Sequence, residues 1–195
     1  GIDDTGAIYI YCFSMGDVGT IMYNGNPNIF VPNGPSLGKY NSDGQLLWAK
    51  SLGHHIDGDI AVQGDRIYFV GGTYLTEPTL LSESIEHNAS LGVSVLAALD
   101  TSATQVLWRT TYPSTVLSNF VDFSIANDST LVLVGAYQDS LFLPNDTLVG
   151  PTSEYRTFSA VIDSSGMTRS VSVLAANTSN SRVSAAPDGS FYQVL

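Results

Sequence analysis

A short phrase that returns along the chain constrains this sequence more than any other feature. Ile67–Gly71 reads IYFVG and is echoed about 60 residues later by Leu131–Gly135, LVLVG. A second phrase, Lys39–Trp48, returns as Ala98–Trp108, and Val161–Gly166 is a blurred third copy. Each unit of a repeat array buries its apolar face only against its neighbours, so repeats decide the architecture before local propensity does.

The segments between turns read as strands. They are short apolar runs rich in Ile, Val, Tyr, Phe and Thr, and they are bounded by Gly, Asn, Asp, Ser and Pro. No window keeps the 3.6-residue period of a helix beyond two turns. Asp43-Gly44 and Asp188-Gly189 are typical of tight reversals, because both residue types tolerate positive φ. We therefore predict an all-β fold.

Each period holds four strand candidates. The first ends at Val62 or Ala126 and the second starts five residues later, at Ile67 or Leu131. Four antiparallel strands in a period of this size predict a β-propeller-type repeat with about three blades. The expected repeats are 1–62, which starts within a blade, 63–126 and 127–186, with 187–195 beginning a fourth. A propeller of four to eight blades needs more than this, so we expect a segment of a larger propeller or array.

A longer and more variable stretch separates the second and third strands of every period. These stretches are Ser14–Gly38, Gly72–Leu96 and Ala136–Ser159, and they are rich in Asn, Gly, Pro and Ser. Loops on one face of a repeat array are where binding usually occurs, so we expect loops with that role here.

The phrase GKYNSDGQLLWAKSLG at Gly38–Gly53 resembles the SBBP-type β-propeller repeat, whose pattern is a similar hairpin followed by IAVDxxGNVYVTG. The second half reads IAVQGDRIYFVGG here, at Ile60–Gly72. The resemblance weakens toward the end, where Ser170 takes the position of Trp48 and Trp108. It implies a secreted or surface-exposed propeller and brings no catalytic residues with it.

A second resemblance competes with the first. Ala97–Thr101 followed by Val106–Arg109 is similar to the tryptophan-docking repeat of PQQ-dependent dehydrogenases and of outer-membrane assembly lipoproteins. In those propellers the tryptophan packs between blades, so we expect Trp48 and Trp108 to be largely buried between neighbouring sheets. The PQQ enzymes also need adjacent cysteines, and this chain has one Cys. We expect no cofactor.

Charge and hydropathy narrow the setting. The formal net charge is −11, which argues against nucleic acid and against docking on anionic membranes. Only 13% of the residues are charged, and a surface of neutral polar groups favours an extracellular or cell-surface protein. No apolar run approaches 18 residues, so no membrane insertion is expected. The single Cys12, inside an apolar run, reads as a small buried hydrophobe.

Two motifs suggest chemistry but read better as structure. Asp4-Thr5-Gly6 matches the aspartic-protease tripeptide, yet it occurs once and aligns with turn positions. His54–Asp59 reads HHIDGD, which could hold Zn²⁺ or Ca²⁺, but it falls in a linker between repeats without counterparts elsewhere. We predict no catalytic residue, no metal site and no enzyme activity.

Four Asn-x-Ser/Thr sequons carry a more usable signal, since none lies in the middle of an expected strand. The glycosylation candidates are Asn88, Asn127, Asn145 and Asn177. Unmodified polar turns are the alternative.

The pattern favours an extracellular structural or adhesive propeller module, in the form of a glycosylated component of a surface assembly or filament. Its expected partners are other copies or further repeats of the same protein, and glycans. The alternative function is a carbohydrate- or peptide-binding propeller domain that recognises its ligand at the axial mouth.

Overall fold

The computed structural model is built from β-strands, and its described part contains no helix. Accordingly, no helix in that part is long and apolar enough to cross a membrane. Every residue is described except 15–18, 24–25, 32–33, 55–56, 74–77, 87–91, 128–129, 177–181, 187–189 and 195; the side chains of 13–14, 19–23, 26–31, 54, 57, 126–127, 175–176 and 193–194 are also left out. The all-β prediction is confirmed.

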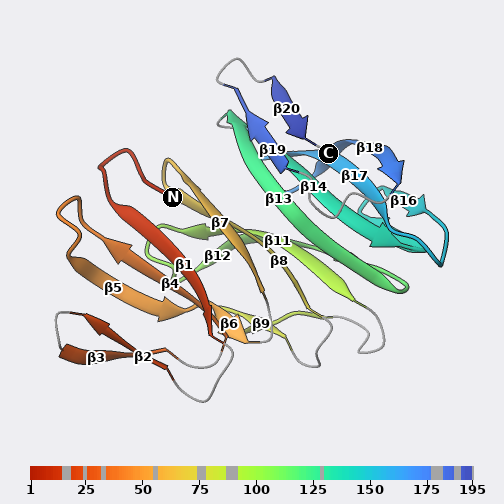
Figure 1. Ribbon diagram of the computed structural model, residues 1–195. Coiled ribbons are helices and arrows are strands. Elements are labelled where there is room, and N and C mark those ends of the chain that lie inside the picture. Colours follow the sequence, from red (N-terminus) through yellow and green to blue (C-terminus); the bar gives the residue numbers. More distant parts are fainter. Residues whose placement is uncertain are drawn as a thin grey trace.

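Two four-stranded antiparallel sheets form the middle and the end of the molecule, and each follows chain order (Figure 1). The second sheet is β7 (Asp57–Gln63), β8 (Arg66–Thr73), β11 (Val93–Asp100) and β12 (Val106–Pro113). The third sheet is β13 (Leu117–Asn127), β14 (Thr130–Gln138), β17 (Arg156–Asp163) and β18 (Thr168–Ala176). The expected repeat boundaries at 62/63 and 126/127 fall inside the β7–β8 and β13–β14 hairpins.

Two partial sheets flank these. The first sheet is β1 (Ile8–Ser14), β4 (Gly34–Tyr40) and β5 (Leu46–Ser51), and Ile2 bridges to Ile8 at its edge. At the other end, β19 (Arg182–Ala185) pairs with β20 (Phe191–Val194). By register, β1, β8, β14 and β20 are equivalent second strands.

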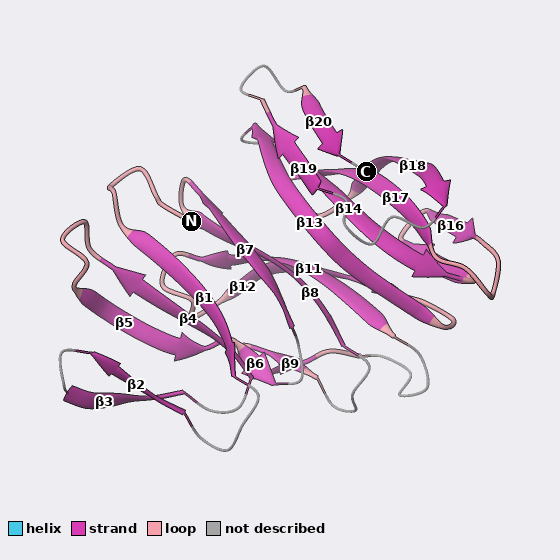
Figure 2. Cartoon of the chain, viewed as in Figure 1, coloured by secondary structure: helices cyan, strands magenta, loops and turns pink. Residues whose placement is uncertain are grey.

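The stretches between second and third strands hold short strands as well as connections, which corrects the expectation of loops. In the first sheet, β2 (Gly19–Tyr23) pairs with β3 (Asn26–Val31). In the second, β9 (Thr79–Leu80) pairs with both β10 (Glu83–Ser84) and β6 (Gly53–His54). In the third, β15 (Ser140–Leu143) pairs with β16 (Asp146–Val149). Figure 2 shows these hairpins beside the larger sheets. Backbone pairing satisfies polar groups that a packed loop would leave without partners.

One turn design recurs between the third and fourth strands. Asn41, Asp100 and Asp163 each accept backbone N–H groups of the turn through a side-chain oxygen, for example Ser165 N at 2.9 Å and Met167 N at 3.1 Å from Asp163 Oδ1. Such Asx bonds fix the hairpin locally. The strand register shifts at the same place in all three sheets, between Lys39 and Tyr40, between Ala98 and Leu99, and between Val161 and Ile162. The same turn bonding and the same shift in register thus occur in all three sheets.

The second sheet is buried on both faces. Tyr68, Val70 and Leu96 join an apolar cluster shared with the third sheet, whereas Ile67, Phe69 and Leu99 join one shared with the first sheet. Side chains alternate across a strand, so a sheet covered on both faces needs apolar residues in succession. This explains the apolar runs Ile67–Val70 of β8 and Val95–Leu99 of β11.

The two tryptophans occupy equivalent positions, opposite Lys39 in the first sheet and Ala98 in the second. Both are partly buried at the margin of an apolar cluster. A Cβ on Gly166, in the turn of the third sheet, would lie 2.7 Å from Trp108 Cε3, so this turn rests on the indole of the preceding sheet. Ala103, the equivalent turn residue of the second sheet, is 2% exposed and belongs to the cluster that Trp48 packs against.

Hydrogen bonds accompany these contacts. We name the contact between the first and second sheets (Trp48, Lys50 and turn 100–105) the first seam, and that between the second and third sheets (Trp108, Thr110 and turn 163–167) the second seam. Lys50 Nζ donates to Ser102 O at 2.5 Å in the first seam. At the equivalent place in the second, Thr110 Oγ1 donates to Gly166 O at 3.1 Å. The acceptor at each seam is a backbone carbonyl of the turn.

Candidate functional site

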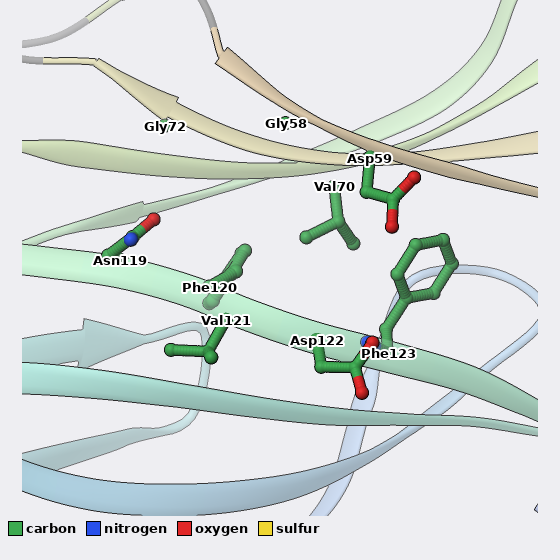
Figure 3. Close-up of a pocket in the computed structure, with 9 residues that line it drawn as sticks. All are labelled: Gly58, Asp59, Val70, Gly72, Asn119, Phe120, Val121, Asp122 and Phe123. Atoms are coloured by element: carbon green, nitrogen blue, oxygen red, sulfur yellow. The ribbon is translucent and has the colours of Figure 1, made fainter. Parts of the chain in front are cut away.

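A cleft of about 370 Å³ opens between the second and third sheets (Figure 3). Strands β7 and β8 form one wall and β13 forms the other. The cleft is lined by Gly58, Asp59, Val70, Gly72, Asn119, Phe120, Val121, Asp122 and Phe123. The two sheets thus contribute side chains from about 60 residues apart in the sequence to one hollow.

On the β7 wall, Gly58 lies so close to the backbone of β8 that no side chain fits at this position. A Cβ there would lie 2.0 Å from Val70 O and 2.8 Å from Gly71 Cα, distances that no other residue type can accept. The Gly58 N–H donates to the hydroxyl of Tyr11, 2.9 Å away on the first sheet. At Gly58 the wall of the cleft is therefore backbone, and the hydroxyl of Tyr11 from the first sheet holds it in place.

A β-bulge shapes the opposite wall. The pairing of β13 with β14 steps from Phe120↔Gly135 to Asp122↔Val134, which leaves Val121 as the extra residue. A regular strand sends alternate side chains to opposite faces, and a bulge interrupts that alternation. This accounts for five consecutive residues of β13, 119–123, lining one cleft.

Both carboxylate oxygens of Asp122 accept hydrogen bonds from the backbone. Its Oδ1 accepts the N–H of Phe123 at 3.0 Å, and its Oδ2 accepts the N–H of Val183 on β19 at 2.8 Å. Ser124, two residues further along the same face of β13, accepts the N–H of Ala185 at 3.0 Å. Both side chains tie β13 to the following strand pair, so Asp122 is not placed to act as a general base.

Asp59 holds the same position in the second sheet, since it pairs with Val70 as Asp122 pairs with Val134. Its Oδ1 accepts the N–H of Ile60 at 2.7 Å, and the residue is exposed. In Figure 3 its carboxylate points toward the ring of Phe123 across the cleft. Among the described residues, the hydrogen bond to the Asp59 carboxylate comes from the next residue in the chain, so Asp59 presents an acceptor to the cleft.

The cleft combines polar side chains with an apolar surface. Its polar side chains are two carboxylates and the amide of Asn119, and its apolar surface comes from Val70, Phe120 and Phe123. The described residues that line it include no Ser, Cys, Lys or His, so the lining offers no nucleophile activated by a base. A neutral ligand that donates hydrogen bonds, such as a sugar hydroxyl or a peptide amide, matches this set.

The structure places only part of the expected glycosylation sites. Asn145 is exposed in the turn between β15 and β16, as expected. Asn127, expected in a turn, is instead the last residue of β13 and pairs with Thr130, and its side chain is outside the described part. Asn88 and Asn177 lie outside the described residues. Glycosylation stays a prediction, with Asn145 as the best-placed acceptor.

Asp4-Thr5-Gly6 lies in a hairpin turn. The hydrogen-bonded acid there is Asp3, whose Oδ1 accepts Thr5 Oγ1 at 2.6 Å, Thr5 N at 3.0 Å and Ala7 N at 3.0 Å. These bonds, led by the Thr5 hydroxyl and opposed by burial, lower the pKa of the Asp3 carboxyl. Asp4 itself is exposed.

The HHIDGD run is mostly strand rather than linker, which corrects the expectation. Its first residue ends β6, and Asp57–Asp59 begin β7, where pairing with β8 directs the backbone. Residues 55–56 and the side chains of His54 and Asp57 lie outside the described part. Among the described residues, no group of three His, Cys, Asp or Glu is arranged to hold a metal ion.

Cys12 is exposed, so the expectation of a buried side chain is wrong. Its neighbour Tyr11 turns inward to Phe69, with 6.2 Å between ring centroids. Strand alternation then places Cys12 on the outer face of β1.

Several residues that build the site were missed from the sequence. Tyr11 and Asp122 act through partners that are distant in the chain, which no local pattern reveals, and Asn119 reaches the cleft only through the register of β13. The repeat register was the one available signal, because aligning the periods brings Asp59 and Asp122 to one position.

Comparisons with protein-family models and with curated proteins do not assign this chain to a family. No protein-family model matches it, and none of the curated proteins is similar to it at a significant level.

Proposed function

We propose that this chain is a β-propeller-type repeat module, similar to SBBP repeats, that serves as an extracellular structural or adhesive part. Its four-stranded antiparallel sheets would be the blades. The carrying observation is that, at both seams, the side chain two residues after a tryptophan donates to a backbone carbonyl in a turn of the next sheet. A joint of the same kind at successive sheets is what a scaffold of stacked units requires.

The seams support this function because they depend little on sequence. Each uses one aromatic side chain and backbone carbonyls as acceptors, so further units of the same backbone shape could be added in the same way. The acidic, lysine-poor composition and the exposed sequon at Asn145 favour a surface setting. The expected partners remain further repeats or other copies, and glycans.

Electron microscopy of the native particle tests this proposal. A ring of blades or an extended array, with sheets about 60 residues apart in the chain, is the expected result. Labelling of intact cells with an antibody to the chain should reveal it at the surface. An isolated particle of unrelated architecture, or purely intracellular material, would overturn the proposal.

A carbohydrate- or peptide-binding propeller domain is the second candidate, and the cleft at Asp59 favours it. Its ligand would accept an Asn119 amide hydrogen bond, donate to Asp59 and cover Phe123. Screening glycan and peptide arrays with wild type and Asp59→Asn tests this. Asp43→Asn, an exposed carboxylate in a turn, is the matched control. Binding that survives Asp59→Asn unchanged would rule the cleft out.

A further inference from the structure

The β15–β16 hairpin presents an aromatic ring to solvent beside the Asn145 sequon. Phe142 is 41% exposed, although its neighbours Leu141 and Leu143 are buried. Its cross-strand partner is Thr147, which is the third residue of the sequon and is itself exposed. Side chains of a directly opposite pair lie on the same face of the hairpin, with Cβ atoms about 5 Å apart. The ring and the sequon threonine therefore form one accessible surface.

The inner face of the hairpin holds this surface in place. Leu141, Leu143 and Leu148 belong to the apolar cluster shared by the second and third sheets. At the base of the hairpin, the N–H of Ser140 donates to the hydroxyl of Thr115 at 2.9 Å. Because the strand pair is already anchored, a group that binds to its outer face orders little additional chain.

The turn places the acceptor asparagine at the end of the same surface. Pro144 and Asn145 are the two residues between the strands, and Leu143 pairs with Asp146 to close the turn. Proline fixes its own φ, which restricts the turn further. Asn145 is exposed and follows Phe142 by three residues, a separation of at most about 10 Å along the chain. A sugar attached to Asn145 thus begins next to the ring.

The sequence distinguishes this sequon from the other three. Asn145 is the one with an aromatic residue three positions earlier, and the one with threonine rather than serine two positions later. The residues three positions before the other sequon asparagines are Ile85, Ser124 and Leu174. A ring beside the attachment point is therefore a specific property of β15–β16 and not of sequons in this chain generally.

A sugar is a suitable partner for an exposed aromatic ring. A pyranose has a face formed by C–H groups, and these partly positive hydrogens are attracted to the negative face of the π system. Contact between the two faces also removes apolar surface from water. The partner of Phe142 across the hairpin is a neutral threonine, so its ring can take up such a contact without displacing an ion pair.

We propose that the outer face of β15–β16 is a seat for the first sugar of a glycan linked to Asn145, with the C–H face of that sugar on the Phe142 ring beside the Thr147 methyl group. In the linkage step, Asn145 Nδ2 bonds to the anomeric carbon of a lipid-diphosphate-linked oligosaccharide. The bond from that carbon to the diphosphate oxygen breaks, the lipid diphosphate leaves with the bonding electrons, and Nδ2 loses one proton. The inference rests on the extracellular setting of the proposed function, because the secretory pathway supplies this donor.

Secretion of the chain from cultured mammalian cells that make only high-mannose glycans tests the seat. Peptide mass spectrometry should find Asn145 almost fully occupied. After an endoglycosidase has trimmed the glycans to one N-acetylglucosamine, the melting temperature should be about 2 °C above that of Asn145→Gln treated in the same way. An unoccupied Asn145, or equal melting temperatures, would overturn the inference.

Variants of the ring locate the sugar. Phe142→Ala should abolish the gain in melting temperature that the sugar at Asn145 provides, and Phe142→Tyr, which keeps an aromatic face, should retain it. Phe191→Ala is the matched control, since Phe191 is also 41% exposed on a strand, and it should leave the gain unchanged. A full gain in Phe142→Ala would refute the seat. If that variant does not fold, Phe142→Leu replaces it, and an equal gain in the leucine and tyrosine variants refutes the seat in the same way.

This inference and the proposed function can fail separately. Native protein that is intracellular and carries no sugar would overturn the extracellular role, whereas a gain that depends on Phe142 in the secreted protein would still support the seat. Conversely, a sugar at Asn145 whose effect is independent of Phe142 would remove the seat and leave the extracellular role standing.

Discussion

The two seams share a backbone and differ in what fills them. In both, the side chain two residues after a tryptophan donates to a turn carbonyl of the next sheet, and in the second seam the turn also rests on the indole of Trp108. The first seam adds a polar cluster of Asp3, Tyr9 and Lys39, whereas the second leaves a hollow beside Gln63.

This difference separates what joins the sheets from what occupies the space between them. Carbonyl acceptors and an indole are enough to hold two sheets in register, because they are present at both seams. The identity of the residue opposite tryptophan, Lys39 or Ala98, is then free to vary. A repeat array can therefore keep its geometry and still differ locally in chemistry.

The largest expected effect comes from removing the shared element. Trp108→Ala and Trp48→Ala should each lower the free energy of unfolding by about 3 kcal/mol, since each indole packs against an apolar cluster. Urea denaturation followed by circular dichroism measures both. A loss below about 1 kcal/mol at either site, in a protein that unfolds cooperatively, would show that this seam does not rest on its tryptophan.

Alanine substitution at two glycines distinguishes the cost of backbone strain from the cost of a steric contact at the second seam. Gly166 and Gly44 have φ of 85° and 77°, so alanine is strained at both. A Cβ at Gly166 meets Trp108 at 2.7 Å, but nothing lies within 4 Å at Gly44. We expect Gly166→Ala to cost about 2 kcal/mol more than Gly44→Ala, which itself costs about 1 kcal/mol. Equal costs in thermal unfolding would contradict the docking of this turn on Trp108.

The polar cluster of the first seam should matter less than the joint. Lys39→Met keeps the length of the side chain and removes the amine from Asp3 and Tyr9, so a loss of about 1 kcal/mol in unfolding free energy is expected. Lys50→Met, which removes the donor to Ser102 O, is the comparison at the same seam. In high salt the loss of unfolding free energy caused by Lys39→Met should be smaller, because screening weakens a partly exposed ion pair.

The smallest effect concerns the Asx turns at low pH. The hydrogen bond from the Ser165 hydroxyl is the main cause of a lowered pKa at Asp163. Burial raises this pKa, but backbone N–H groups and Arg169 lower it further. A pKa lowered by folding contributes stability that is present above about pH 4 and is lost as the pH falls below it. Asp163→Asn should therefore reduce, by about 0.5–1 kcal/mol, the unfolding free energy that the protein loses as the pH falls below about 4.

Asn41 supplies the control for that prediction. It makes the same turn bonds, to Asp43 N at 3.1 Å and Gln45 N at 2.8 Å, without a titrating group. Asn41→Asp should steepen the acid limb. If neither substitution changes the curve, the turn carboxylates do not carry the acid sensitivity.

Much of the fold could be predicted because its signal is local and repeated. The constant spacing from Val62 to Ile67 and from Ala126 to Leu131 reflects β-hairpins that the structure contains. The apolar runs predicted strands correctly because a sheet covered on both faces needs such runs.

The candidate site was less predictable, since it depends on register and on contacts between sheets. The bulge at Val121 carries no sequence mark, and the acceptor role of Asp122 requires β19, more than 50 residues away. Cys12 was misassigned for a similar reason. An apolar run does not say which of two adjacent side chains faces inward, and here Tyr11 does.

The chain has two lysines, and both serve the first seam. Modification of lysine side chains in this sequence therefore reports on a single joint. Acetylation or a bulky amine label at Lys39 would neutralise a charge that faces Asp3, and a lysine-specific protease would cleave only where β4 and β5 lie against the neighbouring sheet. Reactivity at these two side chains, followed over time, gives a direct measure of how often that joint opens.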